Sequence, residues 1–371
     1  MKKWQKLLST FLVGTGMFCA ALIPPAIADA QQNKEAASPV ILDTDMVDWL
    51  DDGAAMLMLA KSPKTNLLGV TVVFGNTWVE TGTASAIRQL EGIGADDVPV
   101  LMGVNEPIRK DRFQYIADET KLFGRNKDDH MGAAGYPQPA SWQEAYRQNY
   151  KAEPKYTPEA QAAPDFIIDA VRQRPNEVTI VAIGSGANLA AAVKKAPDIA
   201  PLIKRVIYMG GNFFQQGNVM PYAEFNVWID PEAEKAAFRA PFGEQVIVPL
   251  DACEKIHITR DRYFAMKKML KNPIFKDLLK NHWMTPFFEN DQVLDDNYVW
   301  DVLSAAIAID PSVIKEEVTY PVDVIDQYGP AYGTTMAYKG VGPEGTQKAR
   351  IILTVDEKKI WKMLYQLCRE L

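Results

Sequence analysis

The sequence predicts an α/β protein with a single large domain, in which helices cover both faces of a mainly parallel, doubly wound (Rossmann-like) sheet. Short runs rich in Val and Ile recur along the chain, and stretches with the apolar spacing of helices lie between them. This alternation is typical of βαβ units, whose parallel strands are buried on both faces and therefore form continuous apolar runs. In such sheets ligands bind beyond the carboxyl ends of the strands, so polar residues there are candidates for a site.

The first thirty residues have the composition of a secretory signal peptide. Three lysines among the first six residues precede a mostly apolar stretch at 7–23, and Ala28-Asp29-Ala30 places small residues at both cleavage-determining positions. We expect cleavage before Gln31 and export by a bacterial route, to the periplasm or the medium, with a folded domain at 31–371. A membrane anchor is the alternative, but the apolar stretch is barely long enough to span a bilayer.

The charge of the chain argues against several kinds of partner. Its formal net charge is −7, and removal of residues 1–30, which carry three lysines and one aspartate, leaves −9. An acidic protein of this kind binds nucleic acid and anionic membranes poorly, so we expect a small-molecule partner and no membrane contact after cleavage. Cys253 and Cys368 remain in the mature chain and allow one disulfide, although the sequence does not show whether they meet.

The predicted elements alternate through most of the chain. The first strand begins at Val40. Further strands are predicted at 67–74, 98–102, 178–183, 205–209 and 245–248, and helices at 81–93, 164–174 and 231–238. Residues 318–355 alternate like an antiparallel region and precede a closing helix at 356–370. Residues 105–163 have no clean period, which predicts an irregular insertion that serves as a lid, a substrate loop or a subunit contact.

Acidic residues gather where the first strand ends. Asp43 and Asp45 close the strand, and Asp48, Asp51 and Asp52 follow in the next turn. Five carboxylates so close together repel one another unless a cation or a hydroxyl-rich ligand lies between them. No Cys or His lies in this stretch, so the pattern favours a hard cation such as calcium or magnesium over zinc. We expect Asp43 to be structural and Asp48 to be a solvated turn residue. Taken alone, the Asp51-Asp52 pair fits a helix N-terminus equally well.

Further polar motifs follow the other predicted strands. After Ile41-Leu42-Asp43-Thr44-Asp45 and Asp51-Asp52, the series continues with Phe74-Gly75-Asn76-Thr77, Val181-Ala182-Ile183-Gly184, Gly210-Gly211, Gly217-Asn218, Glu224-Phe225-Asn226, Asp230-Pro231-Glu232-Ala233 and Trp300-Asp301. In this order and spacing the series resembles the calcium-dependent nucleoside hydrolases of the inosine-uridine-preferring type. The resemblance extends from about Pro39 to Pro311, and the 105–163 segment matches poorly.

The resemblance implies a Ca²⁺ site and a hydrolytic mechanism. The carboxylates of Asp45, Asp52 and Asp301 and the main-chain carbonyl of Ile183 correspond to the calcium ligands, which leaves room for a water and two ribose hydroxyls. Asp45 is expected to take a proton from the water that attacks the anomeric carbon of the ribose.

The resemblance also assigns the substrate contacts. Asp51 is expected to bind the ribose 2-hydroxyl. The side chains of Asn76, Asn218, Glu224 and Asn226 are expected to bind the other hydroxyls and the water, and Phe225 is a candidate for stacking on the base. The family is usually dimeric or tetrameric, which implies a homodimer or a homotetramer.

Two departures from the family pattern bear on the site. Five residues separate Asp45 from Asp51 where the family usually has three, so the turn must bulge, and Trp49 on the bulge is expected to project toward the base. Many members have His immediately before the last calcium aspartate, but this chain has Trp300. An aromatic ring at that position indicates the purine-preferring branch, in which stacking helps the base to leave. His130 in the insertion is the one histidine that is a candidate to reach the base.

Two other functions remain open at this point. A periplasmic nucleoside- or pentose-binding protein without catalysis fits the same fold, since function depends on the site and not on the fold. A haloacid-dehalogenase-type phosphatase is the other alternative, because Asp43-Thr44-Asp45 has the Asp-x-Asp pattern of those enzymes. It would require magnesium, with Asp43 as the nucleophile.

Overall fold

The computed structural model describes residues 37–371 except 48, 128–129 and 296, so the predicted signal peptide lies outside the described residues. Six strands in this part form a parallel core: β1 (Ser38–Thr44), β2 (Thr65–Val72), β3 (Val100–Met102), β4 (Thr179–Ala182), β5 (Arg205–Met209) and β6 (Gln245–Val248). A C-terminal group of β7 (Ile314–Val324), β8 (Thr335–Ala337) and β9 (Gln347–Val355) extends the sheet, whose order is β3-β2-β1-β4-β5-β6-β9-β7-β8. Strand β9 is parallel to β6, and β7 is antiparallel to both β8 and β9.

The strand order places the topological switch point of the sheet beside β1. The chain runs outward from β1 through β2 to β3 and then returns to the other side of β1 as β4. Segments that follow β1 and β4 therefore leave the sheet in opposite directions, and this switch point is where open α/β sheets bind ligands. Asp43 of β1 pairs with Ala182 of β4, so the residues that follow each strand emerge side by side.

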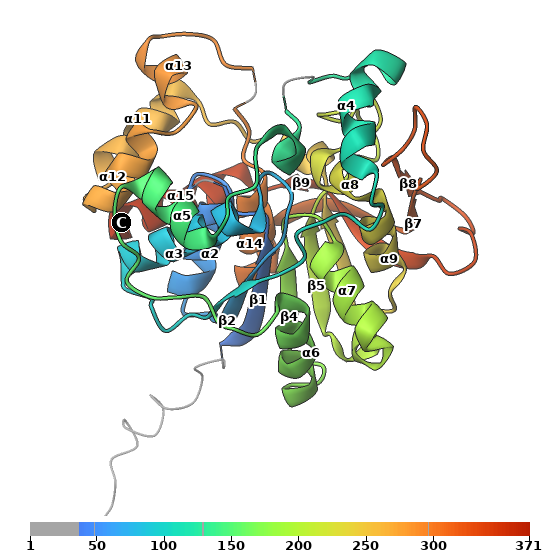
Figure 1. Ribbon diagram of the computed structural model, residues 1–371. Coiled ribbons are helices and arrows are strands. Elements are labelled where there is room, and N and C mark those ends of the chain that lie inside the picture. The colour runs from blue at the N-terminus through green and yellow to red at the C-terminus, as the bar shows by residue number, and fades with distance from the viewer. Residues whose placement is uncertain (1–36, 48, 128–129, 296) are drawn as a thin grey trace, which may run out of the picture. The chain divides into compact units, whose positions relative to one another are not determined.

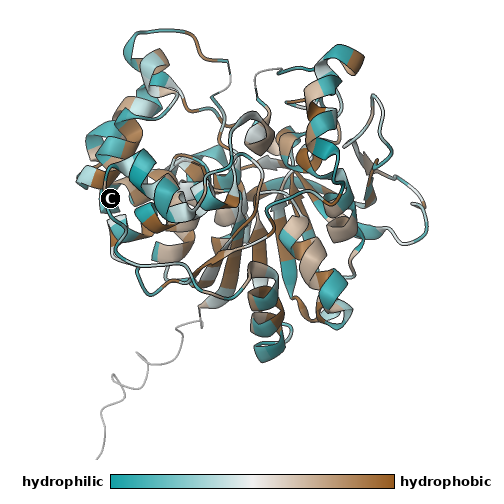
Figure 2. Cartoon of the chain, in the orientation of Figure 1, coloured by the Kyte–Doolittle hydropathy of each residue, from teal (hydrophilic) through white to brown (hydrophobic). Residues whose placement is uncertain are grey.

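Neighbouring residues of one strand contribute to different cores, which confirms the doubly wound fold. Val40 and Leu42 belong to one core, which includes α2 (Asp52–Lys61), α3 (Val79–Ile93), α5 (Trp142–Tyr150), α14 (Asp301–Ile309) and α15 (Glu357–Glu370). Ile41 belongs to the other, which includes α6 (Ala163–Gln173), α7 (Ala187–Lys195) and α9 (Pro231–Arg239). Figure 1 shows these two groups of helices on opposite faces of the sheet, and Figure 2 shows apolar strands with polar residues on the outward faces of the helices.

The remaining helices and 3-10 turns lie in the connections between these elements. They are α4 (Arg112–Phe123), α8 (Phe225–Ile229), α10 (Leu250–Cys253), α11 (Arg260–Met269), α12 (Pro273–Lys280) and α13 (Thr285–Glu289), with 3-10 turns η1 (Gly132–Gly135), η2 (Pro197–Leu202) and η3 (Pro311–Val313). Within the described residues, no helix has both the length and the apolar character that a membrane span requires. Cys253 and Cys368 are both buried and are not joined by a disulfide.

The prediction of an irregular 105–163 segment was wrong in part, because the segment contains α4 and α5. Helix α4 lacks the apolar period of a typical amphipathic helix, because its buried side includes Arg112 and Glu119, with only Ile116 as a buried apolar residue. The Arg112 guanidinium donates to Glu119 at 2.6 Å and to the Trp228 carbonyl at 2.5 Å, and the Trp228 indole donates to Glu119 at 2.6 Å. A charged pair thus holds the helix to α8 where an apolar stripe would usually do so.

Candidate active site

Asp45 lies directly after β1 and is fully buried. Its Oδ2 accepts a hydrogen bond of 2.6 Å from the backbone N–H of Asn76, which follows β2. A Cβ atom at Gly75 would lie 2.7 Å from Cβ and Cγ of Asp45, and one at Gly184 would lie 2.7 Å from the Asp45 backbone nitrogen. Glycines after β2 and β4 therefore let both segments pack tightly against Asp45, which fixes the direction of its carboxylate.

The second carboxylate oxygen of Asp45 fits a cation. Oδ1 is buried and has no hydrogen-bond partner among the described residues. Burial raises the pKa of this carboxyl from 3.8 to about 7, and the negative charges of Asp51 and Glu224 add to the rise. An orphaned buried acceptor costs free energy unless a ligand satisfies it, and a divalent cation is the ligand that this negative surrounding favours.

Three more carboxylates converge beside the end of β1. Ligand oxygens of Asp51, Asp52 and Asp301 lie within 4.8 Å of one another. The Thr44 hydroxyl donates to Asp52 at 2.5 Å, and the Asp301 backbone N–H donates to Asp51 at 2.8 Å. Asp52 begins α2 and Asp301 begins α14, so the positive ends of two helix dipoles meet at the cluster. Oxygen-only donors of this kind suit a hard cation, and Asp51, predicted as a substrate contact, lies in the same cluster as Asp52 and Asp301.

The widened turn after Asp45 does not carry Trp49 toward the base. Trp49 is 2 % exposed and packs edge-on against Phe275 of α12, with ring centroids 6.0 Å apart. The expectation that it projects toward the base was therefore wrong. Its large apolar ring gains more from burial in the core than a single stacking contact would supply.

Ile183 and Asn226 meet at the ends of β4 and β5. The Asn226 amide donates to the carbonyl oxygen of Ile183 at 3.1 Å and to that of Met209 at 3.0 Å. A carbonyl oxygen has two lone pairs, so the Ile183 carbonyl retains one for a cation. The amide nitrogen of Asn226, predicted to contact substrate, thus also joins two strand ends.

Glu224 and Asn218 stabilise the start of α8. The buried Glu224 carboxylate accepts from the backbone N–H groups of Gly211 at 2.9 Å and Asn226 at 3.0 Å, and Asn218 Oδ1 accepts from that of Phe225 at 3.0 Å. Burial raises the pKa of Glu224 to about 7, against the lowering effect of these hydrogen bonds. Both side chains therefore help to position the start of α8, where Phe225 lies.

The 105–163 segment contacts Phe225 and the loops near it. The Ala133 N–H donates to the Gly75 carbonyl at 2.8 Å, and the His130 ring lies 4.6 Å from that of Phe225. The Asn126 side chain donates to the Gly217 carbonyl at 2.7 Å, which ties the insertion to the loop before Asn218. Of the three histidines, His130 is the one with a described ring contact to a predicted substrate residue. His257 instead bonds Asn297, and His282 is buried near Met284.

Trp300 is half-buried and immediately precedes α14. Its ring packs edge-on against Tyr298, with centroids 5.8 Å apart, and its carbonyl accepts from the Cys253 thiol at 3.8 Å. Because the next residue is Asp301, the Trp300 backbone lies directly beside the acidic cluster. Asp43 has a different environment. It is buried inside β1 and accepts from Thr71 Oγ1 at 2.6 Å and Asn188 Nδ2 at 2.7 Å, which agrees with a structural role.

Comparison with known proteins decides the family. The family model described as inosine-uridine preferring nucleoside hydrolase matches residues 40–362. The chain belongs to this family. Nucleoside hydrolases are N-glycosidases, so this chain is an enzyme of that class. The phosphatase alternative was wrong, because the chain belongs to the nucleoside hydrolase family. Asp43, the nucleophile that it would require, is fully buried within β1.

Individual relatives agree with the family. A probable uridine nucleosidase 2 from Oryza sativa is 32% identical over 232 residues, which are 62% of this chain and 60% of the rice protein. The pyrimidine-specific ribonucleoside hydrolase RihB from Escherichia coli is 29% identical over 333 residues, 89% of this chain and 96% of that protein. The solved structure of a plant nucleoside hydrolase, the PpNRh1 enzyme, has a TM-score of 0.72 and 25% identity, and covers 90% of this chain and 99% of its own.

Proposed function

We propose that this nucleoside hydrolase is an exported, calcium-dependent enzyme that cleaves the N-glycosidic bond of ribonucleosides to give free base and ribose. Two observations near the switch point of the sheet carry the proposal: the convergence of Asp51, Asp52 and Asp301, and the buried, orphaned Oδ1 of Asp45, whose pKa burial and the charge of Asp51 raise. The family match supports hydrolysis of an N-glycosidic bond, and the clustered carboxylates support the binding of a cation.

The proposal assigns Asp45, Asp52, Asp301 and the Ile183 carbonyl to calcium, with Asp51 as a further carboxylate beside it. Oxygen donors at this density and charge suit calcium, which accepts six to eight oxygens in flexible geometry. When bound, the cation would lower the pKa of a ligated water and orient ribose hydroxyls.

The protein groups then divide the work of hydrolysis. Asp45 accepts a proton from water through Oδ1 while Oδ2 stays hydrogen-bonded to the Asn76 backbone. The water oxygen bonds to C1′ of the ribose, the C1′–N bond breaks, and the base leaves with the bonding electrons. The base takes up a proton from solvent, and Asp45 later releases its proton to solvent. Side chains of Asn76 and Asp51 bind sugar hydroxyls most strongly as C1′ flattens toward an oxocarbenium ion.

The base preference has two candidates. A purine preference is supported by Trp300, because an indole ring offers a large face on which a purine stacks. A pyrimidine preference is supported by the names of the rice and Escherichia coli relatives, and by His130, a side chain able to donate a proton whose ring contacts that of Phe225, a residue proposed to stack on the base. We favour a purine preference, because Trp300 immediately precedes Asp301.

Export and assembly complete the proposal. The N-terminal composition supports cleavage before Gln31 and release into the periplasm or the medium. N-terminal sequencing of the protein recovered from a periplasmic extract tests this step, and an intact Met1 in that fraction would contradict it. A homodimer or homotetramer is proposed from the family resemblance, and light scattering at several protein concentrations tests it.

Ribose release from inosine, guanosine, adenosine, uridine and cytidine tests the activity, with and without a calcium chelator. We expect chelator-sensitive release that calcium restores, and faster release from purines. Release that persists after chelation would refute the metal site. Faster release from uridine and cytidine would select the pyrimidine candidate. Saturable nucleoside binding without any release would instead indicate the non-catalytic binding protein.

A further inference from the structure

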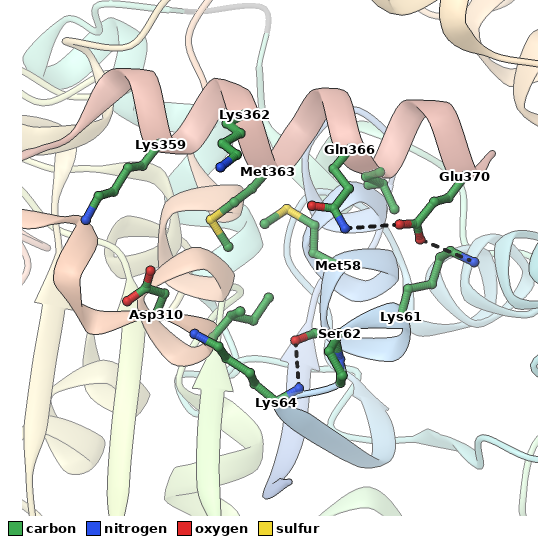
Figure 3. Close-up of a pocket in the computed structure, with 13 residues that line it drawn as sticks. Met58, Lys61, Ser62, Lys64, Asp310, Lys359, Lys362, Met363, Gln366 and Glu370 are labelled. Atoms are coloured by element: carbon green, nitrogen blue, oxygen red, sulfur yellow. Dashed lines mark hydrogen bonds and ion pairs between the residues drawn. The ribbon is translucent and has the colours of Figure 1, made fainter. Parts of the chain in front are cut away.

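A cavity lies at the opposite end of the sheet from Asp45. It occupies the space between the end of α2, the loop that leads into β2, the end of α14 and one side of α15 (Figure 3). Its volume is about 440 Å³, within the range of small-molecule sites. Lys64, in its wall, precedes the amino end of β2, whereas the candidate active site follows the carboxyl ends of β1 and β4. The two sites share no residue.

The cavity has an apolar middle. In Figure 3 the thioethers of Met58 and Met363 lie on facing sides, and Ile309 and Leu367 also line the space. Methionine side chains are flexible and polarisable, so they adapt to apolar ligands of varied shape. An alkyl or aryl body is therefore the ligand part that this region can bury.

One end of the cavity is cationic. Lys64, Lys359 and Lys362 line this end together with Asp310, which gives a local excess of two positive charges on a chain with a formal net charge of −7. Ser312 holds the Lys359 ammonium through its hydroxyl at 2.8 Å and its carbonyl at 3.0 Å. In the part of the chain that the structure describes, Lys64 and Lys362 form no ion pair.

The other end is electrically balanced. Lys61 lies 3.7 Å from the Glu370 carboxylate, which also accepts a hydrogen bond of 3.2 Å from Gln366. The cavity thus has a charge gradient along α15, from a positive end through an apolar middle to a neutral end. An elongated ligand with one anionic head matches this gradient.

We propose that this cavity binds a small amphiphilic carboxylate, with the head group at Lys64, Lys359 and Lys362 and an unbranched apolar body between Met58 and Met363. Octanoate is a suitable probe. Titration into protein labelled with ¹³C at the methionine methyl groups should shift the Met58 and Met363 signals saturably, after their assignment with Met58→Leu and Met363→Leu. The signal of Met209, beside the candidate active site, should not move.

Two further ligands test the separate contributions of the charged head and the apolar body to binding. Two double variants test whether the lysines at the cationic end bind the head group. Octan-1-ol, which lacks the charge, and inorganic phosphate, which lacks the apolar body, should each bind at least about tenfold more weakly than octanoate. The double variant Lys64→Glu/Lys362→Glu should also lose about tenfold in octanoate affinity while its thermal midpoint and ribose release stay unchanged. Lys276→Glu/Lys280→Glu, which changes two exposed lysines on α12, is the matched control and should bind octanoate normally.

Several results would overturn the proposal. They are an absence of saturable Met58 and Met363 shifts, equal binding of octan-1-ol or phosphate, normal octanoate binding by Lys64→Glu/Lys362→Glu, or shifts centred on Met209. The last of these would place the ligand at the candidate active site instead.

Discussion

Gly75→Ala should disable the enzyme without unfolding it. An alanine methyl at this position would lie 2.7 Å from Cβ and Cγ of Asp45 and closer still to Oδ2, whereas real Cβ atoms stay at least 3.0 Å from other atoms. The backbone at Gly75 does not have a positive φ, so alanine is opposed there only by this clash. To relieve it, the Asp45 carboxylate must move by about 1 Å, a displacement that can cost roughly 10²-fold in rate.

Steady-state ribose release measures the effect. A 10²-fold loss of kcat corresponds to about 2.7 kcal/mol of transition-state stabilisation. Calcium affinity by calorimetry should fall as well, while the thermal midpoint should stay within a few degrees of the wild type. The matched control is Gly329→Ala, because a Cβ at Gly329 meets no atom within 4 Å. Wild-type kcat in Gly75→Ala would refute the assignment of Asp45 as the base.

Three further predictions concern stability. Calcium at about 100 times its Kd should raise the free energy of unfolding by about 2.7 kcal/mol in the wild type, but not in Asp52→Asn, as measured by urea unfolding. Arg112→Met should cost about 3–5 kcal/mol, because it leaves the Glu119 carboxylate buried without its cation. Asp230→Asn should flatten the pH dependence of the thermal midpoint. Burial raises the pKa of Asp230 from 3.8 to about 7, so its contribution to stability is fully present below pH 4 and is lost as the pH rises through 7.

Each of these has a control and a contradicting result. Equal stabilisation of Asp52→Asn by calcium would place the cation elsewhere. Arg172→Met removes an exposed pair with Asp198 and should cost less than about 1 kcal/mol, so a similar cost for Arg112→Met would contradict the importance of burial. A thermal midpoint of Asp230→Asn that falls from pH 4 to 7 as steeply as that of the wild type would show that other groups control the slope.

The sequence predicted the parallel core well because its strands are built around short apolar runs, as at 205–209 and 245–248, where prediction and structure have the same bounds. Asp45 could be located from local pattern alone, since it ends such a run. Asp301 could not, because nothing near it indicates proximity to Asp51, 250 residues away, and only the resemblance connected them. The orientation of Trp49 depends on Phe275, and the packing of helix α4 depends on the hydrogen bonds of Arg112 and Glu119 with Trp228. Both are long-range effects that local periodicity does not contain.

The distance in sequence between Asp51 and Asp301 has a consequence for synthesis of the protein. The ligand cluster draws on the first helix after β1 and on α14, so a ribosome must complete about four-fifths of the chain before the cluster can exist. A nascent chain or an N-terminal fragment would hold the acids of the first turn without their partner. Calcium would therefore bind only after the later part of the chain has folded. Once bound, it would link the start of α2 to the start of α14.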